Sequence, residues 1–337
     1  MDYGLMYYNY PECIPTVNIG DYIQSLAAAQ YLPDDCHPVL INREKLSDYS
    51  GEPVKMIMNG WYMHDSTFWP PSQNINPLYV AFHISRDSEK QMLSLEGVNY
   101  LKKHAPIGCR DEDTLQMLQK RGVEAYYSAC LTLTLDKKYT SLGEKSNEII
   151  FVDTCLDSKS FFSRKLENRN LIENKEKNII ESIDIDSKNK PELFYQTYKE
   201  IFPESILKNS AYIRHEIPKI HFTDEKSKFQ YAKKLLDRYS KAQLIVTSRI
   251  HCALPCLALG TPVIYVHDAR SNKKNQARVG KLLELFNIIT ISKKTFSSQD
   301  IDLKALKSDF NNFRLSNKAN YKKYAEKLKV TCDNFIK

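Results

Sequence analysis

The sequence predicts an α/β protein built on parallel sheets. Short apolar runs alternate along the chain with segments whose apolar residues recur at helical spacing. Strands that alternate with helices form parallel sheets joined by crossover helices. The chain has 337 residues, and at about 150 residues per domain this length suggests two domains.

Both halves of the chain show this alternation. The predicted strands are short apolar runs, at 54–59, 77–83, 105–108, 125–128, 148–153, 211–214, 243–247 and 262–266. The predicted helices have apolar residues three and four apart, at 22–30, 95–103, 111–121, 226–239, 250–258 and 279–286. The polar stretch 156–192 is interpreted as surface helices and loops of the second half.

Composition excludes several classes of protein. Hydrophobic residues make up 42% and charged residues 26%, as in soluble globular proteins. The net charge of +7 does not by itself indicate nucleic acid as a partner. No apolar run approaches the roughly 20 residues of a membrane span, and no signal peptide is recognisable. The eight cysteines include no CxxC pair, so we expect a cytoplasmic protein without a metal site.

The strongest site signal is the segment TSRIHCALPCLALGTP at 247–262. A strand ends at Thr247 and a helix starts near Ile250, which places Arg249 and His251 at the carboxyl end of a parallel strand. Ligands of open α/β sheets bind there, and helix amino ends favour anions. Arginine grips carboxylates or phosphates, and histidine transfers protons near neutral pH. The alternative is a salt bridge for Arg249 and a structural hydrogen bond for His251.

Two further segments have the same character, one at a strand-to-helix turn and one just before the helix 22–30. Arg110 follows the strand 105–108, and Asp111 after it is a plausible helix N-cap. Asn18 precedes Gly20, which allows a close backbone approach, and Asp21. Asp21 is either the N-cap of the next helix or a carboxylate that faces a ligand.

Polar and aromatic residues at other strand ends complete the candidates. Asn59 ends the strand 54–59 and could line the same site. Trp61, Tyr62 and His64 follow it and suit stacking on a sugar, with core packing as the alternative. The segment 270–281 contains five basic residues and no acid, and it either folds onto a phosphate or is solvated. No GxGxxG, Walker A or HExxH motif is present, which argues against a P-loop nucleotidase and a typical dinucleotide enzyme.

In this order the motifs resemble the polysaccharide pyruvyl transferase family. The matching segments are NIGDYIQSLAAAQ at 18–30, NGW at 59–61, GCRDEDT at 108–114 and SRIHCALPCLALGTPVI at 248–264. The resemblance implies two Rossmann-like domains that face each other across a cleft, as in GT-B glycosyltransferases. We expect an acceptor-side domain over 1–145, a donor-side domain over 146–315 and a basic helix over 316–337.

The resemblance also implies an activity. Pyruvate would pass from phosphoenolpyruvate to two sugar hydroxyls and leave a cyclic ketal, in the synthesis of a bacterial-type surface polysaccharide such as a capsule or exopolysaccharide. Arg110 and Arg249 would hold the donor, His251 would transfer protons, and a family lysine corresponds to Lys273 or Lys274. The donor is a co-substrate, so no cofactor is expected. We assign the acceptor side to Asn18, Asn59, Trp61 and His64.

The chemistry agrees with these residue types. Phosphoenolpyruvate carries about three negative charges, so several cationic groups must converge on it. Its C3 must gain a proton and an attacking hydroxyl must lose one, which requires an acid and a base. His251 is the predicted acid and Asp21 the predicted base.

Two other functions stay open at this point. One is a GT-B-type glycosyltransferase that uses a nucleotide sugar, for which Asp268 is the only acid near the ribose position. The other is a non-catalytic carbohydrate-binding or scaffold protein.

The carboxyl-terminal segment is strongly basic. Residues 304–337 hold nine basic and three acidic residues. One interpretation is a solvated amphipathic helix whose apolar residues face the protein, namely Phe310, Phe313, Tyr321, Tyr324 and Leu328. The other is attraction to an anionic surface, either the inner face of a membrane or a lipid-diphosphate-linked acceptor.

Overall fold

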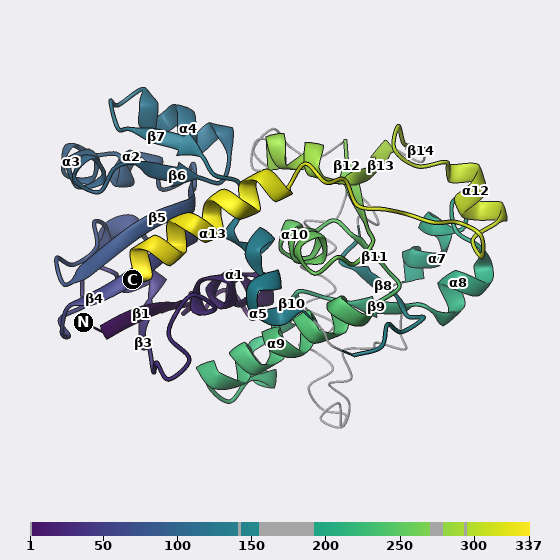
Figure 1. Ribbon diagram of the computed structural model, residues 1–337, viewed down its shortest axis with the longest axis horizontal. Coiled ribbons are helices and arrows are strands. Elements are labelled where there is room, and N and C mark those ends of the chain that lie inside the picture. Colours follow the sequence, from purple (N-terminus) through teal and green to yellow (C-terminus); the bar gives the residue numbers. More distant parts are fainter. Residues whose placement is uncertain (1, 141–142, 155–191, 270–278, 293–294) are drawn as a thin grey trace.

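The computed structural model describes residues 2–140, 143–154, 192–269, 279–292 and 295–337 (Figure 1). Lys273 and Lys274 and most of the polar stretch 156–192 therefore lie outside the described residues.

The first half of the chain forms a parallel sheet of six strands in the order β3-β1-β4-β5-β6-β7. The strands are β1 (Asp2–Tyr7), β3 (Val39–Asn42), β4 (Val54–Tyr62), β5 (Ile75–Ile84), β6 (Ile107–Cys109) and β7 (Ala125–Tyr127). Consecutive residues of the central strands are buried, including Met56, Ile57 and Met58 in β4. Burial on both faces is typical of a parallel sheet covered by helices.

The second half forms another sheet of six strands, in the order β14-β13-β12-β11-β8-β9. Five strands are parallel: β8 (Ile149–Val152), β9 (Ala211–Ile213), β11 (Leu244–Thr247), β12 (Val263–Asp268) and β13 (Asn287–Ser292). The edge strand β14 (Thr295–Ser297) is antiparallel to β13.

Helices connect and cover the two sheets. The α-helices are α1 (Ile19–Ala29), α2 (Glu89–Met92), α3 (Leu95–Lys103), α4 (Glu112–Gln119), α5 (Asp136–Tyr139), α7 (Glu192–Tyr198), α8 (Glu204–Asn209), α9 (Glu225–Lys241), α10 (Ile250–Ala258), α12 (Leu303–Ser308) and α13 (Lys322–Ile336). Short 3-10 turns are η1 (Arg43–Lys45), η2 (Ser66–Phe68), η3 (Leu131–Thr134), η5 (Lys219–His221) and η6 (Gly280–Leu285).

The two halves are joined directly. Strand β2 (Thr16–Asn18) pairs antiparallel with β10 (Glu216–Pro218), and Ile19 N donates to the carbonyl of His215 at 2.8 Å. Next to this pair α1 packs on α9, where the Tyr22 hydroxyl lies 2.5 Å from Glu225. A continuous apolar core runs from the first sheet into the second. The amino end of α1 is thereby fixed against the second half.

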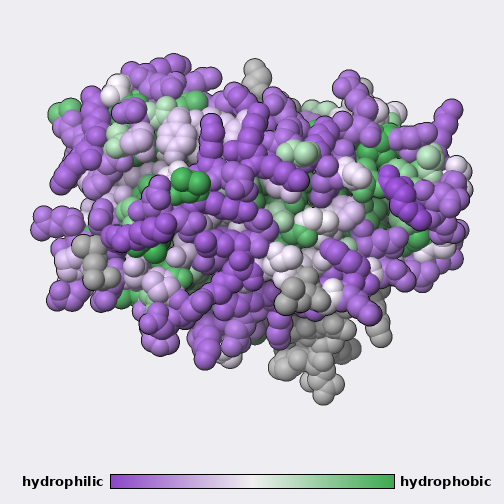
Figure 2. All heavy atoms as spheres, viewed as in Figure 1, coloured by the Kyte–Doolittle hydropathy of each residue, from purple (hydrophilic) through white to green (hydrophobic). Residues whose placement is uncertain are grey.

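The carboxyl-terminal helix returns to the first half (Figure 1). The Tyr3 hydroxyl donates to the carbonyl of Ile336 at 3.3 Å, and Lys55 Nζ donates to that of Phe335 at 3.0 Å. No helix within the described residues is long and apolar enough to cross a bilayer. On the face seen in Figure 2 hydrophilic side chains predominate and apolar ones form small groups.

The predicted α/β class with parallel sheets is confirmed, whereas some element bounds were wrong. The basic helix expected over 316–337 starts at Lys322, and the apolar residues Phe310 to Leu328 are buried or half-buried but do not share one helix. The helix expected over 279–286 is a 3-10 turn. The strands that were not expected are β1, β2, β3, β10, β13 and β14. The predicted boundary at 145/146 falls between the sheets, and the domain division stays a prediction.

Candidate active site

Three predicted segments converge where the amino ends of α1 and α10 meet the carboxyl end of β6. Arg110 directly follows β6, and its Nη1 lies 3.5 Å from Nε2 of His251. A Cβ added to Gly20 would lie 3.1 Å from His251 Cβ and 3.3 Å from its Nδ1. Glycine is therefore needed for α1 to approach the imidazole this closely.

Arg110 is the most unusual group of this site. Its side chain is 0% exposed, and Nη1 also lies 3.5 Å from Oε1 of Gln24. Its Nε and Nη2 have no hydrogen-bond acceptor among the described residues. Because buried polar groups are nearly always paired, these two N–H groups present a fork that fits an anion.

The residues behind Arg110 are structural. Asp111 is the N-cap of α4, since its Oδ1 accepts from Thr114 N at 2.9 Å, and its Oδ2 lies 2.5 Å from His83 Nδ1. Burial acts to raise the pKa of Asp111, but His83, Arg110 and the Thr114 amide outweigh it and hold this pKa below 3.8. The predicted N-cap role of Asp111 is confirmed.

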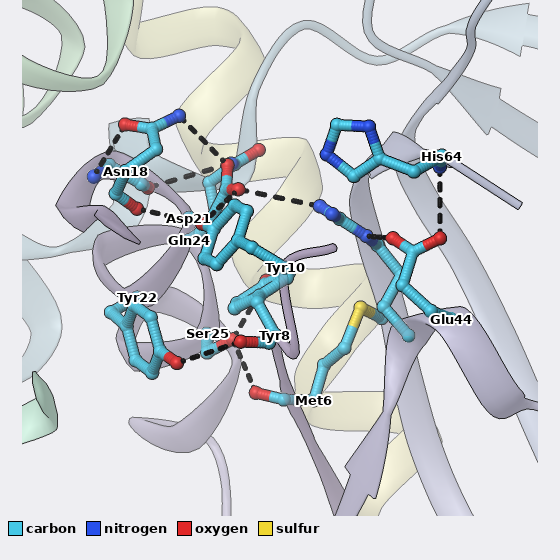
Figure 3. A network of polar contacts seen from close by, with 12 residues as sticks. Met6, Tyr8, Tyr10, Asn18, Asp21, Tyr22, Gln24, Ser25, Glu44 and His64 are labelled. Carbon is cyan, nitrogen blue, oxygen red and sulfur yellow. Dashed lines mark hydrogen bonds and ion pairs between the residues drawn. The ribbon is translucent and has the colours of Figure 1, made fainter. Parts of the chain in front are cut away.

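Asp21 lies in a polar network beside this site (Figure 3). Its Oδ2 accepts from the Tyr10 hydroxyl at 2.7 Å and lies 3.4 Å from Arg43 Nη1. Its Oδ1 accepts from Gln24 Nε2 at 3.2 Å and from Asn18 Nδ2 at 3.3 Å. The N-cap of α1 is Asn18, whose Oδ1 accepts from Gly20 N at 3.1 Å, so the N-cap alternative for Asp21 was wrong.

The residues assigned to the acceptor side take different positions. Asn59 is buried and donates from Nδ2 to the carbonyl of Gln24 at 3.0 Å, so it fixes α1. Trp61 is half-buried and His64 reaches the surface. Their rings are 4.6 Å apart at 62°, which forms an aromatic surface suited to a sugar.

Arg249 forms the salt bridge that the sequence left open. Its Nε donates to Asp153 Oδ2 at 2.9 Å and its Nη2 to Glu216 Oε1 at 2.8 Å. Burial acts to lower the pKa of Arg249, but these two carboxylates outweigh it and raise this pKa. The Nε and Nη2 side of the Arg249 guanidinium is therefore occupied. Arg249 must give up Asp153 or Glu216 before this side can hold a ligand.

Sequence reasoning missed Arg43, Gln24, Tyr10 and Glu44. Gln24 links Asp21 to Arg110, and Arg43 is buried beneath Trp61. Arg43 follows β3, a strand that the sequence did not reveal, so no strand end marked it. The signal that could have revealed β3 is the short apolar run VLIN at 39–42.

Metal-ligand geometry and two surface hollows of the described chain point to no other site. Within these residues no group of three or more His, Cys, Asp or Glu side chains is arranged to hold a metal. A hollow of about 210 Å³ is lined by Asn209, Gln243 and Arg314, and one of about 420 Å³ by Lys138, Lys233 and Lys241. Neither hollow contains Arg110 or His251.

Comparisons with known proteins agree with the motifs. A family model described as polysaccharide pyruvyl transferase matches residues 18–267. Among solved structures, this chain is similar to a functionally uncharacterised protein, KP1_0663, from Klebsiella pneumoniae subsp. pneumoniae NTUH-K2044. The identity is 14% and the TM-score 0.43, over 86% of this chain and 93% of that one. No curated protein matches this chain.

Proposed function

Because this chain belongs to the polysaccharide pyruvyl transferase family, we propose that it transfers pyruvate from phosphoenolpyruvate to two hydroxyls of a sugar as a cyclic ketal. The observation that carries the proposal is the buried guanidinium of Arg110, whose Nε and Nη2 have no acceptor among the described residues, beside the imidazole of His251. A small donor with phosphate and carboxylate oxygens supplies acceptors for such a fork.

The donor binds at the amino ends of α1 and α10. Helix amino ends and a buried cation both favour negative charge. Arg110 contacts one anionic group of the donor. Arg249 contacts the other anionic group of the donor after the guanidinium releases Asp153 or Glu216. Lys273 or Lys274 adds a further cation.

His251 supplies the proton that the enolpyruvyl group needs at C3. The negative charge of a bound donor favours the protonated form of the His251 ring, so donor binding prepares this residue to act as the acid. Proton transfer to C3 makes C2 electrophilic, so a sugar hydroxyl can attack it.

The acceptor sugar stacks on Trp61 and His64. The side chains of Asn18 and Asn59 hold α1 in place, so that the donor and the acceptor meet at its amino end. The enzyme works in the cytoplasm at the inner face of the membrane, where a lipid-diphosphate-linked acceptor is available. The basic residues of 304–337 attract the anionic membrane surface or the diphosphate of this acceptor.

The test is incubation of the full chain with phosphoenolpyruvate and a panel of aryl and lipid-linked glycosides. We expect phosphate release and an acceptor whose mass increases by pyruvate less water. The variant Arg110→Lys serves as the site control, because an ammonium cannot form the two parallel bonds of a guanidinium. Turnover of a nucleotide sugar without use of phosphoenolpyruvate would overturn the proposal and favour a glycosyltransferase.

A further inference from the structure

Arg43 is a buried cation held between two aromatic rings and two carboxylates, while its Nη2 has no acceptor among the described residues. Its side chain is 1% exposed, and Cζ lies 4.7 Å from the ring centre of Tyr8 and 4.8 Å from that of Trp61. Nη1 lies 3.4 Å from Asp21 Oδ2, and Nε donates to Glu44 Oε1 at 2.6 Å. A lysine cannot make both contacts and stack as well, because its ammonium has no planar fork.

Glu44 extends this contact to the turn that carries His64. Its Oε2 accepts from the backbone N–H group of His64 at 2.9 Å (Figure 3) and from that of Asp65 at 3.0 Å. Asp21 connects the same guanidinium to α1, whose Gly20 lies against His251. Arg43 therefore ties the aromatic acceptor surface to the helix end that abuts the donor site.

His64 is better suited than Asp21 to accept a proton. Both oxygens of Asp21 are engaged by four donors (Tyr10, Asn18, Gln24 and Arg43). The imidazole of His64 reaches the surface beside Trp61. Burial and then the charge of Arg43 lower the pKa of His64, partly opposed by Glu44 and Asp21, so the ring is neutral at neutral pH.

We propose that His64 accepts the proton of the attacking sugar hydroxyl and that Arg43 is its positioning residue; this inference rests on the proposed function. As the hydroxyl oxygen bonds to C2 its proton passes to His64, while the C2–C3 π pair takes a proton from His251. The second hydroxyl then displaces phosphate, which leaves with the electron pair of its bond to C2. The second hydroxyl proton returns to His251, and the proton on His64 leaves with the phosphate.

The first experiment compares His64→Gln and Arg43→Lys with the control Arg86→Lys, an exposed arginine outside the proposed site. We expect His64→Gln to lower kcat on the order of 10²-fold with the KM for phosphoenolpyruvate unchanged. Arg43→Lys should raise the KM for the acceptor and leave the KM for phosphoenolpyruvate unchanged. Wild-type kcat in His64→Gln, or equal effects of Arg43→Lys on both KM values, overturns the inference.

The second experiment needs no substrate. The pKa of His64 is followed by NMR of its imidazole carbons in the wild type, Glu44→Gln and Arg43→Met. Loss of the Glu44 charge should lower this pKa further, and loss of the Arg43 charge should raise it. An unchanged His64 pKa in Glu44→Gln contradicts the coupling, even where Arg43→Met does not fold.

The two experiments separate the two proposals. If the wild type transfers nothing from phosphoenolpyruvate, the proposed function is overturned. The NMR titration then still tests whether the charge of Arg43 affects the pKa of His64. A wild type that transfers pyruvate while His64→Gln keeps full activity overturns the role of His64 alone.

Discussion

Nη1 of Arg110 lies 3.5 Å from Nε2 of His251, although 141 positions separate the two residues in the sequence. Arg110 follows a strand of the first sheet, and His251 lies in the first turn of a helix that follows a strand of the second. The contact therefore joins a fixed cation and a proton-carrying ring from opposite halves of the chain. Each residue is expected to have its own kinetic signature.

Removal of the Arg110 guanidinium should weaken donor use without unfolding the protein. Loss of two charge-assisted hydrogen bonds, at about 1.5–3 kcal/mol each, predicts a fall of kcat/KM for phosphoenolpyruvate of roughly 10²- to 10⁴-fold in Arg110→Met. Removal of this charge relieves the desolvation cost of its unpaired Nε and Nη2, which offsets the lost attraction to Asp111, so the free energy of unfolding should change little. Steady-state kinetics and urea unfolding test both points. A destabilised variant would show that Arg110 is structural.

Substitution of His251 should reduce turnover more than donor binding. A positioned acid contributes roughly 10²- to 10⁴-fold to the rate, so His251→Gln should lower kcat by this factor. The KM for phosphoenolpyruvate should change little, because Arg110 remains. We expect the basic limb of the pH profile of kcat to disappear in the variant. Full activity of His251→Gln would exclude the imidazole as the acid.

Substitutions of Arg249 and Glu216 should change the use of phosphoenolpyruvate in opposite directions. If Arg249 exchanges a carboxylate for the donor, Glu216→Gln weakens the competing contact and lowers the KM for phosphoenolpyruvate. Arg249→Ala should instead abolish donor use at ordinary concentrations. Initial rates over a range of donor concentrations measure both effects. A raised KM in Glu216→Gln would mean that this carboxylate holds Arg249 in its working position.

The fold was predictable where strands are long or fully apolar. The runs VKMIMN in β4 and LIVT in β11 are buried and parallel, and their pattern is visible in the sequence. Strands β1 and β3 were missed because Gly4 in β1 and the edge position of VLIN in β3 weaken the apolar signal. Glycine in a strand and a half-exposed edge strand both lack the features that identify a buried strand.

The site was predictable where a residue follows a recognisable strand. Arg110 and His251 lie together as their positions at strand ends suggested, and Gly20, which was predicted to allow a close backbone approach, lies against His251. Arg43 and Gln24 could not be found in this way, because their roles depend on partners that only the folded chain brings near. The salt bridge of Arg249 could not be predicted from the sequence either, because its partners Asp153 and Glu216 lie 96 and 33 positions away along the chain.

Asp111 should make stability depend on pH in the acid range. Its pKa in the folded protein lies below 3.8, so the carboxylate stabilises the fold above that pH, and this contribution is lost as pH falls through the folded pKa. Asp111→Asn should cost about 1–3 kcal/mol at pH 7 and weaken the loss of stability that begins as the pH falls below about 5. Urea unfolding at several pH values tests this. A steeper acid loss in the variant contradicts the assignment.

Gly20→Ala should separate catalysis from stability. Its Cβ would lie 3.1 Å from Asn18 Oδ1 and from His251 Cβ, so the imidazole must move by a few tenths of an ångström. Alanine also favours the helix by about 1 kcal/mol, so the free energy of unfolding should change little while kcat falls.

The matched control is Ala29→Gly at the last position of α1. It should lose up to about 1 kcal/mol of stability and keep kcat, because Ala29 lies at the end of α1 away from His251. Kinetics and urea unfolding of both variants give the comparison. Wild-type kcat in Gly20→Ala would mean that the imidazole tolerates displacement, and a large loss of stability would mean that the close approach of α1 and α10 serves packing alone.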